Sequence, residues 1–378
     1  MPSDLSPCCG ANPVTQRPSR TGRRRNVRLS AAALGVVIAT AVSVVGNSVS
    51  ALPYRIQRVD AFSGAVNRPA AGPGTNILLM GTDGRDTISS REKKKFHAGG
   101  VACDCTDSLM LIHVSHRRDE VSVVSLPRDS LARIPAHRDP GTGERFPAHP
   151  AKINAAFAEG GPALSIRTVE AMTNVRVDHY LQIDFRRFMD SVNAVEGVDV
   201  CTSRRLSDSA TKLDLRPGRH RLGGGQALQY VRSRHVDASA DLGRIQRQHR
   251  FLISVMHRLD TGGILADPGR AIDLARTVLG ATKVDQGFTP KELVSLSTAL
   301  SRLSPSRAEF TSVPIAGFNP VVEGLGETLK WDKAAAKKMF ATLNKDRSLT
   351  PRNSTVKPSD PPRIGVETVV RGNTLACS

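Results

Sequence analysis

The stretch SLMLIHVSHRRDEVSVVSL, residues 108–126, contains two apolar runs separated by a charged turn. The runs Ser108–Val114 and Val121–Leu126 are short, rich in leucine and β-branched residues, and flanked by turn residues, which is typical of buried strands. A third run of the same kind, Asn76–Met80 (NILLM), precedes them. The three runs predict neighbouring strands of one sheet.

Helical patterns alternate with these strands. Apolar residues recur at helical spacing in Lys152–Asn174 and in Leu242–Leu259, whereas His179–Phe185 (HYLQIDF) alternates as a strand. Strands interleaved with helices predict an α/β fold with a mixed central sheet flanked by helices, an α/β/α sandwich in which ligands collect at the strand ends.

Charged residues stand at the ends of the three predicted strands. Asp83 and Arg85 follow the first strand in GTDGRD, Asp107 precedes the second in CTDSLML, and Arg128 and Asp129 follow the third in SLPRDS. If the second strand runs antiparallel to the other two, all of these side chains meet at one edge of the sheet. The pattern therefore predicts a charged crevice there.

The stretch YVRSRHVDASADLGRIQRQHR, residues 230–250, is rich in arginine and lacks lysine. If its start is a strand, Arg232 and Arg234 share one face, and Arg244 and Arg247 share one face of the helix that follows. A guanidinium grips phosphate oxygens in pairs, so the choice of arginine favours a phosphate site.

Pyrophosphate chemistry fits this set of charges. Asp83 and Asp107 are suited to hold Mg²⁺, which takes one or two protein carboxylates together with phosphate oxygens. Surrounding arginines would neutralise charge on a transferring phosphoryl group. Taken singly, each aspartate also fits a turn or helix cap, and each arginine fits a solvated surface position. The recurrence at strand ends favours a site.

The N-terminal region predicts a membrane anchor. Residues 1–28 form a basic arm, and residues 29–52 are an uncharged, largely apolar segment long enough to span a bilayer as a helix. The positive flank places the arm in the cytoplasm and the remaining chain outside the cell membrane as a single-pass protein. A cleaved signal peptide ending at Val49–Ala51 is the alternative interpretation.

Composition limits the partners. The chain has 378 residues and a net charge of +18, which suits an anionic substrate, a membrane surface or nucleic acid. An aromatic content of 4% argues against binding of single strands by base stacking, and an extracytoplasmic location argues against sequence-specific DNA binding. We therefore expect the membrane, and no nucleic acid, among its partners.

The remaining chain divides into a tether at 53–75, a catalytic domain at 76–345 and a flexible C-terminal tail at 346–378. Four cysteines lie outside the membrane in this arrangement: Cys103, Cys105, Cys201 and Cys377. In an oxidising compartment we expect a disulfide from the Cys103–Cys105 pair to Cys201. Free thiols remain the alternative.

Five motifs in order resemble those of the LytR-CpsA-Psr family of cell-wall glycopolymer ligases: NILLMGTDGRD, TDSLMLIHV, VVSLPRDS, KINAAFAEGG and YVRSRHVDASADLGRIQRQ. The match covers residues 76–259, with a weaker continuation to 345. The resemblance implies an anchored extracytoplasmic phosphotransferase that moves a glycopolymer from a polyprenyl-pyrophosphate carrier to a peptidoglycan hydroxyl, with Mg²⁺.

The resemblance also assigns roles to the matching residues. It places Asp83 and Asp107 at the metal. It gives catalysis to Asp107 with Arg128, Arg232, Arg234 and Arg244, and it adds Arg85, Arg247 and Gln248 to these arginines as pyrophosphate ligands. One departure is Cys105, which stands where many relatives have an arginine. Another is the lysine run at 93–95, which would steer an anionic substrate or form a solvated loop.

Mechanistically, we expect a sugar hydroxyl to attack the phosphorus next to the glycopolymer, with Asp107, Asp129 or Asp241 as the general base. The helices at 152–174 and 242–259 are expected to wall an apolar channel for the lipid. Three alternatives stay open: a lipid-pyrophosphate phosphatase, a non-catalytic carrier-lipid-binding protein, and a transcriptional regulator, which the predicted topology disfavours.

Overall fold

The computed structural model describes residues 57–84, 88–99, 106–236, 240–261, 274, 277, 283–289, 292, 305–321, 323–350 and 369–372. Within these ranges, no helix is both long and apolar enough to cross a membrane. The predicted basic arm at 1–28 and the predicted span at 29–52 lie outside the described residues, as do Arg85, Cys103, Cys105 and Cys377.

An eight-stranded mixed sheet forms the centre of the described fold. Its strands lie in the order β1 (Gln57–Val59), β14 (Lys283–Asp285), β9 (His179–Ile183), β2 (Thr75–Thr82), β3 (Thr106–Val114), β4 (Val121–Leu126), β15 (Ala308–Ser312) and β18 (Val370–Arg371). β3 is antiparallel to both β2 and β4, whereas β2 pairs parallel with β9 and β4 pairs parallel with β15. The predicted direction of the second strand is therefore confirmed.

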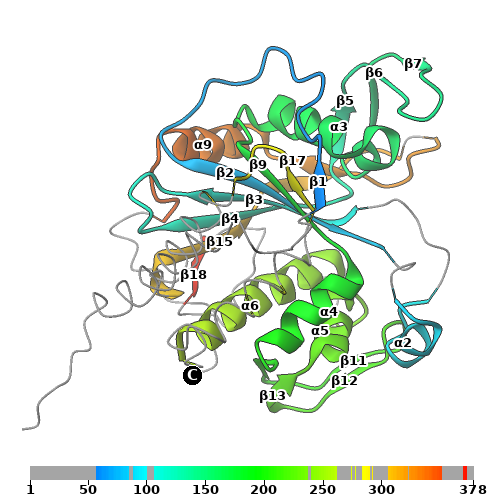
Figure 1. Cartoon of the computed structure of the whole chain (residues 1–378), viewed down its shortest axis with the longest axis vertical. Helices are drawn as coiled ribbons and strands as arrows, with labels where there is room; N and C mark the ends of the chain where they lie inside the picture. Colours follow the sequence, from blue (N-terminus) through cyan, green and yellow to red (C-terminus); the bar gives the residue numbers. More distant parts are fainter. Residues whose placement is uncertain are drawn as a thin grey trace, which may run out of the picture.

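Helices cover both faces of this sheet (Figure 1). Because successive strand residues point to opposite faces, Leu78 and Met80 belong to the core beneath α3 (Ala155–Thr173) and α9 (Lys333–Asn344). Their neighbour Ile77 belongs to the opposite core, which includes residues of α6 (Ala240–Thr261). α4 (Phe185–Ala194) and α5 (Gly224–Arg232) lie on the α6 side in Figure 1. The predicted mixed sheet flanked by helices is confirmed.

Three predicted boundaries are wrong. Residues 230–232 end helix α5 instead of forming a strand, because Ala227 and Tyr230, three positions apart on one helix face, are both buried. Lys152 belongs to β8 (His149–Lys152), ahead of α3. Phe185 starts α4 after Asp184, whose carboxylate caps that helix by accepting from the Arg187 amide.

Shorter elements surround the sheet. Five two-stranded antiparallel sheets are described: β5 (Leu131–Ile134) with β8, β6 (His137–Arg138) with β7 (Arg145–Phe146), β10 (Val198–Thr202) with β13 (Gly218–Leu222), β11 (Leu206–Asp208) with β12 (Leu213–Leu215), and β16 (Ile315–Phe318) with β17 (Leu329–Trp331). A 3₁₀ turn at Pro305–Arg307 precedes β15. The lysine run is on a helix, α2 (Ser90–Lys95), capped by Ser89 and Glu92.

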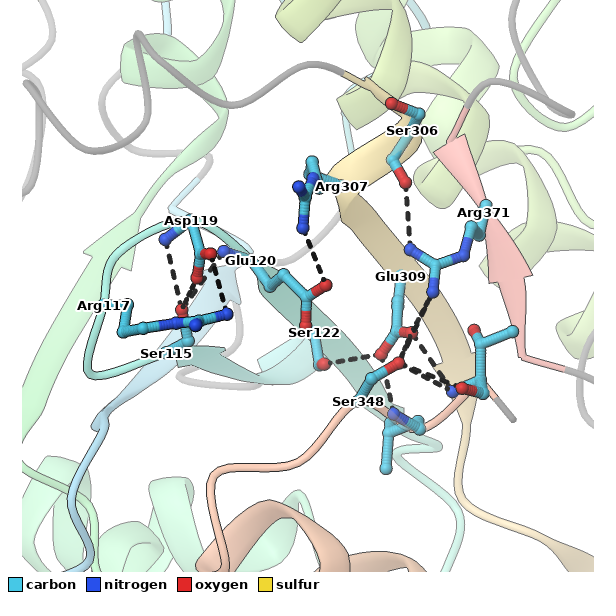
Figure 2. A network of polar contacts seen from close by, with 12 residues as sticks. Ser115, Arg117, Asp119, Glu120, Ser122, Ser306, Arg307, Glu309, Ser348 and Arg371 are labelled. Carbon is cyan, nitrogen blue, oxygen red and sulfur yellow. Dashed lines mark hydrogen bonds and ion pairs between the residues drawn. The ribbon is translucent and has the colours of Figure 1, made fainter. Parts of the chain in front are cut away.

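Segments expected outside the domain contribute strands to it. β1 lies in the expected tether, and β18 lies in the expected tail. The buried Glu309 carboxylate holds the tail. It accepts from the amides of Leu349 and Thr350 at 2.8 and 3.1 Å, and Arg371, drawn beside it in Figure 2, lies 3.4 Å away. Ser122 of β4 donates to the same carboxylate at 3.0 Å. The described parts of residues 346–372 therefore pack against the sheet.

Candidate active site

The predicted strand-end charges do meet at one edge of the sheet. Asp83 follows β2, Arg128 follows β4, and Asp107 is the second residue of β3 between them. The β2–β3 register shifts here, because Gly81 pairs with Ser108 while Thr82 pairs with Thr106. Asp107 is therefore the extra residue of a β-bulge, which redirects a side chain at a sheet edge.

One cavity of about 650 Å³ opens at this edge. It lies between the sheet and the α4, α5 and α6 layer. Its polar lining includes Asp83, Asp107, Arg128, Arg232, Arg234 and Arg244. Both Asp107 and Ser108 line it, although consecutive residues of a regular strand would face opposite sides. The bulge thus brings the Asp107 carboxylate into the cavity.

A chain of alternating charges links the polar residues. Arg128 Nη1 donates to Asp107 Oδ1 at 2.7 Å, and Arg234 Nη2 lies 3.6 Å from the same oxygen. Arg234 Nε lies 3.5 Å from Asp241 Oδ1, and Asp241 Oδ2 accepts a hydrogen bond from Arg244 Nη2 at 3.0 Å. Three guanidinium groups and two carboxylates therefore form one connected cluster with an excess of positive charge, suited to an anion.

Arg244 is the most deeply placed of these arginines. It is 3% exposed, and its Nε has no hydrogen-bond partner among the described residues. Burial lowers the pKa of the Arg244 guanidinium to about 10, although Asp241 acts in the opposite direction. The group stays charged at neutral pH, so a buried cation that is paired with Asp241 through Nη2, and whose Nε has no partner among the described residues, lines the cavity.

Asp129 lies beside this cluster. Its carboxylate is 3.0 Å from Lys152 Nζ and 3.4 Å from Arg128 Nε. Burial alone would raise the pKa of Asp129, but the hydrogen bond from Lys152 and the neighbouring positive charges lower it overall. Asp129 is not among the residues that line the cavity. Asp129 is therefore placed to hold the Arg128 side chain in position.

Arg232 lines the cavity mouth from the end of α5. Its guanidinium carbon stands 4.6 Å from the centre of the Phe185 ring, and its Nη1 donates to the His97 carbonyl at 3.3 Å. A planar guanidinium stacked on a ring keeps its edge directed outward. Arg232 and Arg234 both reach the site, although the element that carries them is a helix end and a turn.

Of the other residues expected to bind phosphate, one lines the cavity and another does not. Gln248 lines the cavity, and its amide donates to the Val231 carbonyl at 3.3 Å. Arg247 is 5% exposed, is not a lining residue, and donates from Nη2 to the Ser233 carbonyl at 2.5 Å. Arg244 and Arg247 were predicted to share one helix face, but only Arg244 of the two lines the cavity. Arg85 lies outside the described residues.

The part of the lining at the strand ends, called the mouth here, is charged, and the rest of the lining, called the interior, is largely apolar. α4, α5 and α6 supply most of its lining, including Phe188, Val192, Val231, Phe251, Val255 and Leu259. The expectation that the helix at 152–174 forms a wall is wrong, because α3 packs on the opposite face of the sheet and supplies no lining residue. The cavity therefore joins a charged mouth to an apolar interior that suits a hydrocarbon chain.

The donor set at the mouth fits a magnesium ion only with help from a ligand. Asp83 and Asp107 line the same cavity from adjacent strands, and Asp83 is 3% exposed. Among the described residues, no group of three or more His, Cys, Asp or Glu side chains is arranged to hold a metal. Two carboxylates completed by phosphate oxygens and waters are a normal Mg²⁺ environment.

Two residues near the cluster were not predicted. Lys152 is bound to Asp129, and the 1% exposed Asp208 accepts from the amides of Arg234 and His235. Neither stands next to a predicted strand end in the sequence. Among the cysteines, Cys201 is disulfide-bonded. Its expected partners Cys103 and Cys105 lie outside the described residues.

Together, the fold and the site define an α/β protein with a cluster of arginines and aspartates at one part of a largely apolar cavity. The chain belongs to the LytR_cpsA_psr family, whose model matches residues 42–345. The resemblance seen in the five motifs is thus confirmed over most of the chain.

Three similar proteins have names that refer to cell wall biosynthesis, to teichoic acid transfer or to an enzyme of this kind. The chain is 31% identical over 312 residues to the probable cell wall biosynthesis protein LcpB of Corynebacterium glutamicum, covering 82% of this chain and 69% of that protein. It is 27% identical to the polyisoprenyl-teichoic acid–peptidoglycan teichoic acid transferase TagU of Oceanobacillus iheyensis, covering 66% and 69%. The LytR-Csp2A-Psr enzyme from Actinomyces oris shares the fold, with a TM-score of 0.57 at 21% identity, over 77% of this chain and 96% of that one.

Proposed function

We propose that this protein is a glycopolymer–peptidoglycan phosphotransferase. Its donor would be a polyprenyl-pyrophosphate-linked glycopolymer, its acceptor a peptidoglycan hydroxyl, and its product a phosphodiester. The transferase names of relatives such as TagU support the reaction class. We further propose that residues 29–52 anchor the chain in the cell membrane, with the basic arm in the cytoplasm and the catalytic domain outside.

The single observation that carries this proposal is the cavity with two chemically distinct parts. Its mouth presents Arg128, Arg232, Arg234 and Arg244, while its interior is lined by apolar side chains. A soluble nucleotide or sugar phosphate would leave the apolar interior unfilled. A pyrophosphate that carries a long hydrocarbon chain would occupy both parts at once.

In the proposed reaction, the acceptor oxygen attacks the phosphorus next to the glycopolymer. The new P–O bond forms as the bond from that phosphorus to the bridging oxygen breaks, and the polyprenyl monophosphate leaves with the bonding electrons. The arginine cluster stabilises the negative charge on the equatorial and leaving oxygens. The hydroxyl proton passes to a carboxylate.

Among the three candidate bases, Asp107 is the one that lines the cavity. Asp241, which accepts a hydrogen bond from Arg244 Nη2 at 3.0 Å, and Asp129, which pairs with Lys152, are not among the lining residues. We therefore propose Asp107 as the proton acceptor. Because the transition state of phosphoryl transfer is loose, the nucleophile needs little deprotonation in advance, so a weak carboxylate base suffices.

We propose that Asp83 and Asp107 hold Mg²⁺ through carboxylate oxygens, with the pyrophosphate supplying further ligands. When bound, the ion would neutralise charge on the phosphate oxygens. Arg128 and Arg234, which contact Asp107, would then orient this carboxylate for both the ion and the substrate.

The test is a transfer reaction with the full-length chain in detergent, a polyprenyl-pyrophosphate-linked saccharide, a peptidoglycan oligomer and Mg²⁺. We expect a covalent phosphodiester product that is lost in Arg234→Ala and in Asp83→Asn. The matched control is Arg219→Ala, because Arg219 is an exposed arginine paired with Asp199 and does not line the cavity.

Other outcomes would replace the proposal. Release of saccharide phosphate without attachment would identify a phosphatase under these conditions. Lipid binding that is unaffected by Mg²⁺ and yields no product would leave a carrier-lipid-binding protein. Protease accessibility of the folded domain on intact cells would test the proposed location.

A further inference from the structure

The turn that follows α5 is fixed by buried polar contacts. It carries Ser233, Arg234 and His235 directly after the last helical residue, Arg232. Ser233 is 0% exposed, and its hydroxyl lies 2.9 Å from Thr211 Oγ1. The turn is therefore anchored to the β11–β12 hairpin before any ligand is considered.

Asp208 makes the strongest of these contacts. Its carboxylate accepts from the Arg234 amide at 2.7 Å, from the His235 amide at 3.1 Å and from the Ala210 amide at 2.9 Å. Burial opposes its ionisation, yet these amide hydrogen bonds lower the pKa of Asp208 overall. The ionised carboxylate of Asp208 thus holds the backbone amide of Arg234 in place.

Arg247 holds the same turn from the opposite side. Its Nη2 donates to the carbonyl of Ser233, the residue between Arg232 and Arg234. The Gln229 side chain instead fixes the neighbouring hairpin, because its amide donates to the carbonyl of Thr211 at 2.8 Å. Side chains from β11 and α6 therefore converge on the backbone of residues 233–235.

We propose that Asp208 and Arg247 are positioning residues that aim Arg234 at the phosphate site. The inference rests on the proposed function for its substrate, a pyrophosphate group. Arg234 reaches Asp107 and Asp241 at 3.6 and 3.5 Å only while the turn keeps its present course. Arg247 acts through the Ser233 carbonyl, and Asp208 acts through the Arg234 amide.

A direct electrostatic role for Asp208 makes the opposite prediction. Asp208 is among the residues that line the cavity, so its negative charge would repel a bound pyrophosphate. On that reading, Asp208→Asn would tighten pyrophosphate binding. If Asp208 positions the turn, the same variant loosens pyrophosphate binding, because a neutral amide oxygen is a weaker acceptor than the carboxylate oxygen that the Arg234 and His235 amides share, and the asparagine NH₂ is left facing the Ala210 amide.

The experiment measures binding of inorganic pyrophosphate to the full-length chain by calorimetry, together with kcat and KM for transfer. For Asp208→Asn we expect pyrophosphate affinity to fall, and kcat/KM to fall by on the order of 10- to 100-fold, as for a displaced catalytic group. The matched control is Asp214→Asn, which removes the same charge from an exposed position of the same hairpin, where Asp214 pairs with Arg205. We expect no change in that control.

Arg247 supplies a second, independent variant. Arg247→Met should lower pyrophosphate affinity and kcat/KM in the same way, and Arg247→Lys should restore part of both, because a lysine retains a donor for the Ser233 carbonyl. Urea unfolding midpoints and near-UV circular dichroism accompany each variant, so that a loss of binding is counted only in a folded chain.

The two proposals fail differently. Unchanged or tighter pyrophosphate binding in folded Asp208→Asn and Arg247→Met would overturn the positioning role. Absence of transfer by the unmodified protein that still binds pyrophosphate would overturn the proposed reaction, and the affinities of the variants would still decide whether Arg234 is positioned as inferred.

Discussion

Replacing Arg244 by methionine should make the protein more stable and abolish its function. Arg244 is a buried cation whose guanidinium faces the cavity, and burial lowers its pKa to about 10. Keeping Arg244 charged in the folded chain therefore lowers the free energy of unfolding, and a neutral side chain would not have this effect. Methionine has a similar length and fills much of the same space.

The size of this cost follows from the lowered pKa. At about 1.4 kcal/mol per pKa unit, a shift from the ordinary arginine value to about 10 corresponds to roughly 3 kcal/mol. The figure already includes the attraction of Asp241, which raises the pKa. After about 1 kcal/mol is allowed for imperfect packing, a net gain of about 2 kcal/mol remains, or a rise in Tm of roughly 4–8 °C.

The direction of the pKa shift decides at which pH the destabilisation by Arg244 can be measured. A cation with a lowered folded-state pKa destabilises the fold at every pH below that value, and the penalty fades as the pH rises through about 10. Thermal unfolding at pH 7 to 8 therefore reports the full gain. In the same samples, pyrophosphate should stabilise the unmodified protein and not Arg244→Met, and transfer should fall by on the order of 100-fold or more.

Two results would refute this reasoning. If Arg244→Met melts below the unmodified protein, the ion pair with Asp241 compensates for burial more fully than the lowered pKa indicates. If the variant is stabilised by pyrophosphate as much as the unmodified protein, Arg244 is not a ligand of that group.

Three further predictions concern the supports of the site and of the fold. Asp129→Asn should destabilise the protein by about 1 kcal/mol at pH 7, because Lys152 loses its charged partner. Since the pKa of Asp129 is lowered, urea titrations should show this difference above the ordinary aspartate pKa of about 3.9 and its loss as the pH falls below it. Glu309→Gln should cost about 2–4 kcal/mol and speed hydrogen exchange after α9, because an amide cannot accept every donor that the buried carboxylate satisfies (Figure 2). Gly225→Ala would place a Cβ 2.0 Å from the Phe96 ring, so the α2 segment should be displaced and trypsin should cleave its lysine run faster; equal cleavage rates would contradict the packing.

Much of the active-site edge was predictable from the sequence. The strands were recognisable because short apolar runs flanked by turn residues leave few other arrangements. Once β3 runs antiparallel to β2 and β4, the residues after one strand and before the next must share an edge. Arg128 and Asp107, 21 positions apart, consequently meet at 2.7 Å.

The path of the chain around Arg232 and Arg234 was not predictable in the same way. Alternation over a few residues fits either a strand or the end of a helix, and burial against neighbouring elements decides between them. The choice matters, because Arg234 takes its direction from the turn after α5. That turn is held by Asp208, 26 positions earlier in the chain.

The sequence alone determined the strands β2, β3, β4 and β9, the charged ends of the first three, and the arginine-rich character of the site, because these depend on local patterns of apolar, turn and charged residues. The tertiary structure decided which residues face the cavity: the β-bulge turns Asp107 inward, and Arg247 lies behind the Ser233 turn instead of in the lining. These outcomes depend on contacts between residues far apart in the chain. A local pattern cannot contain them, because the same residues would point elsewhere against different neighbours.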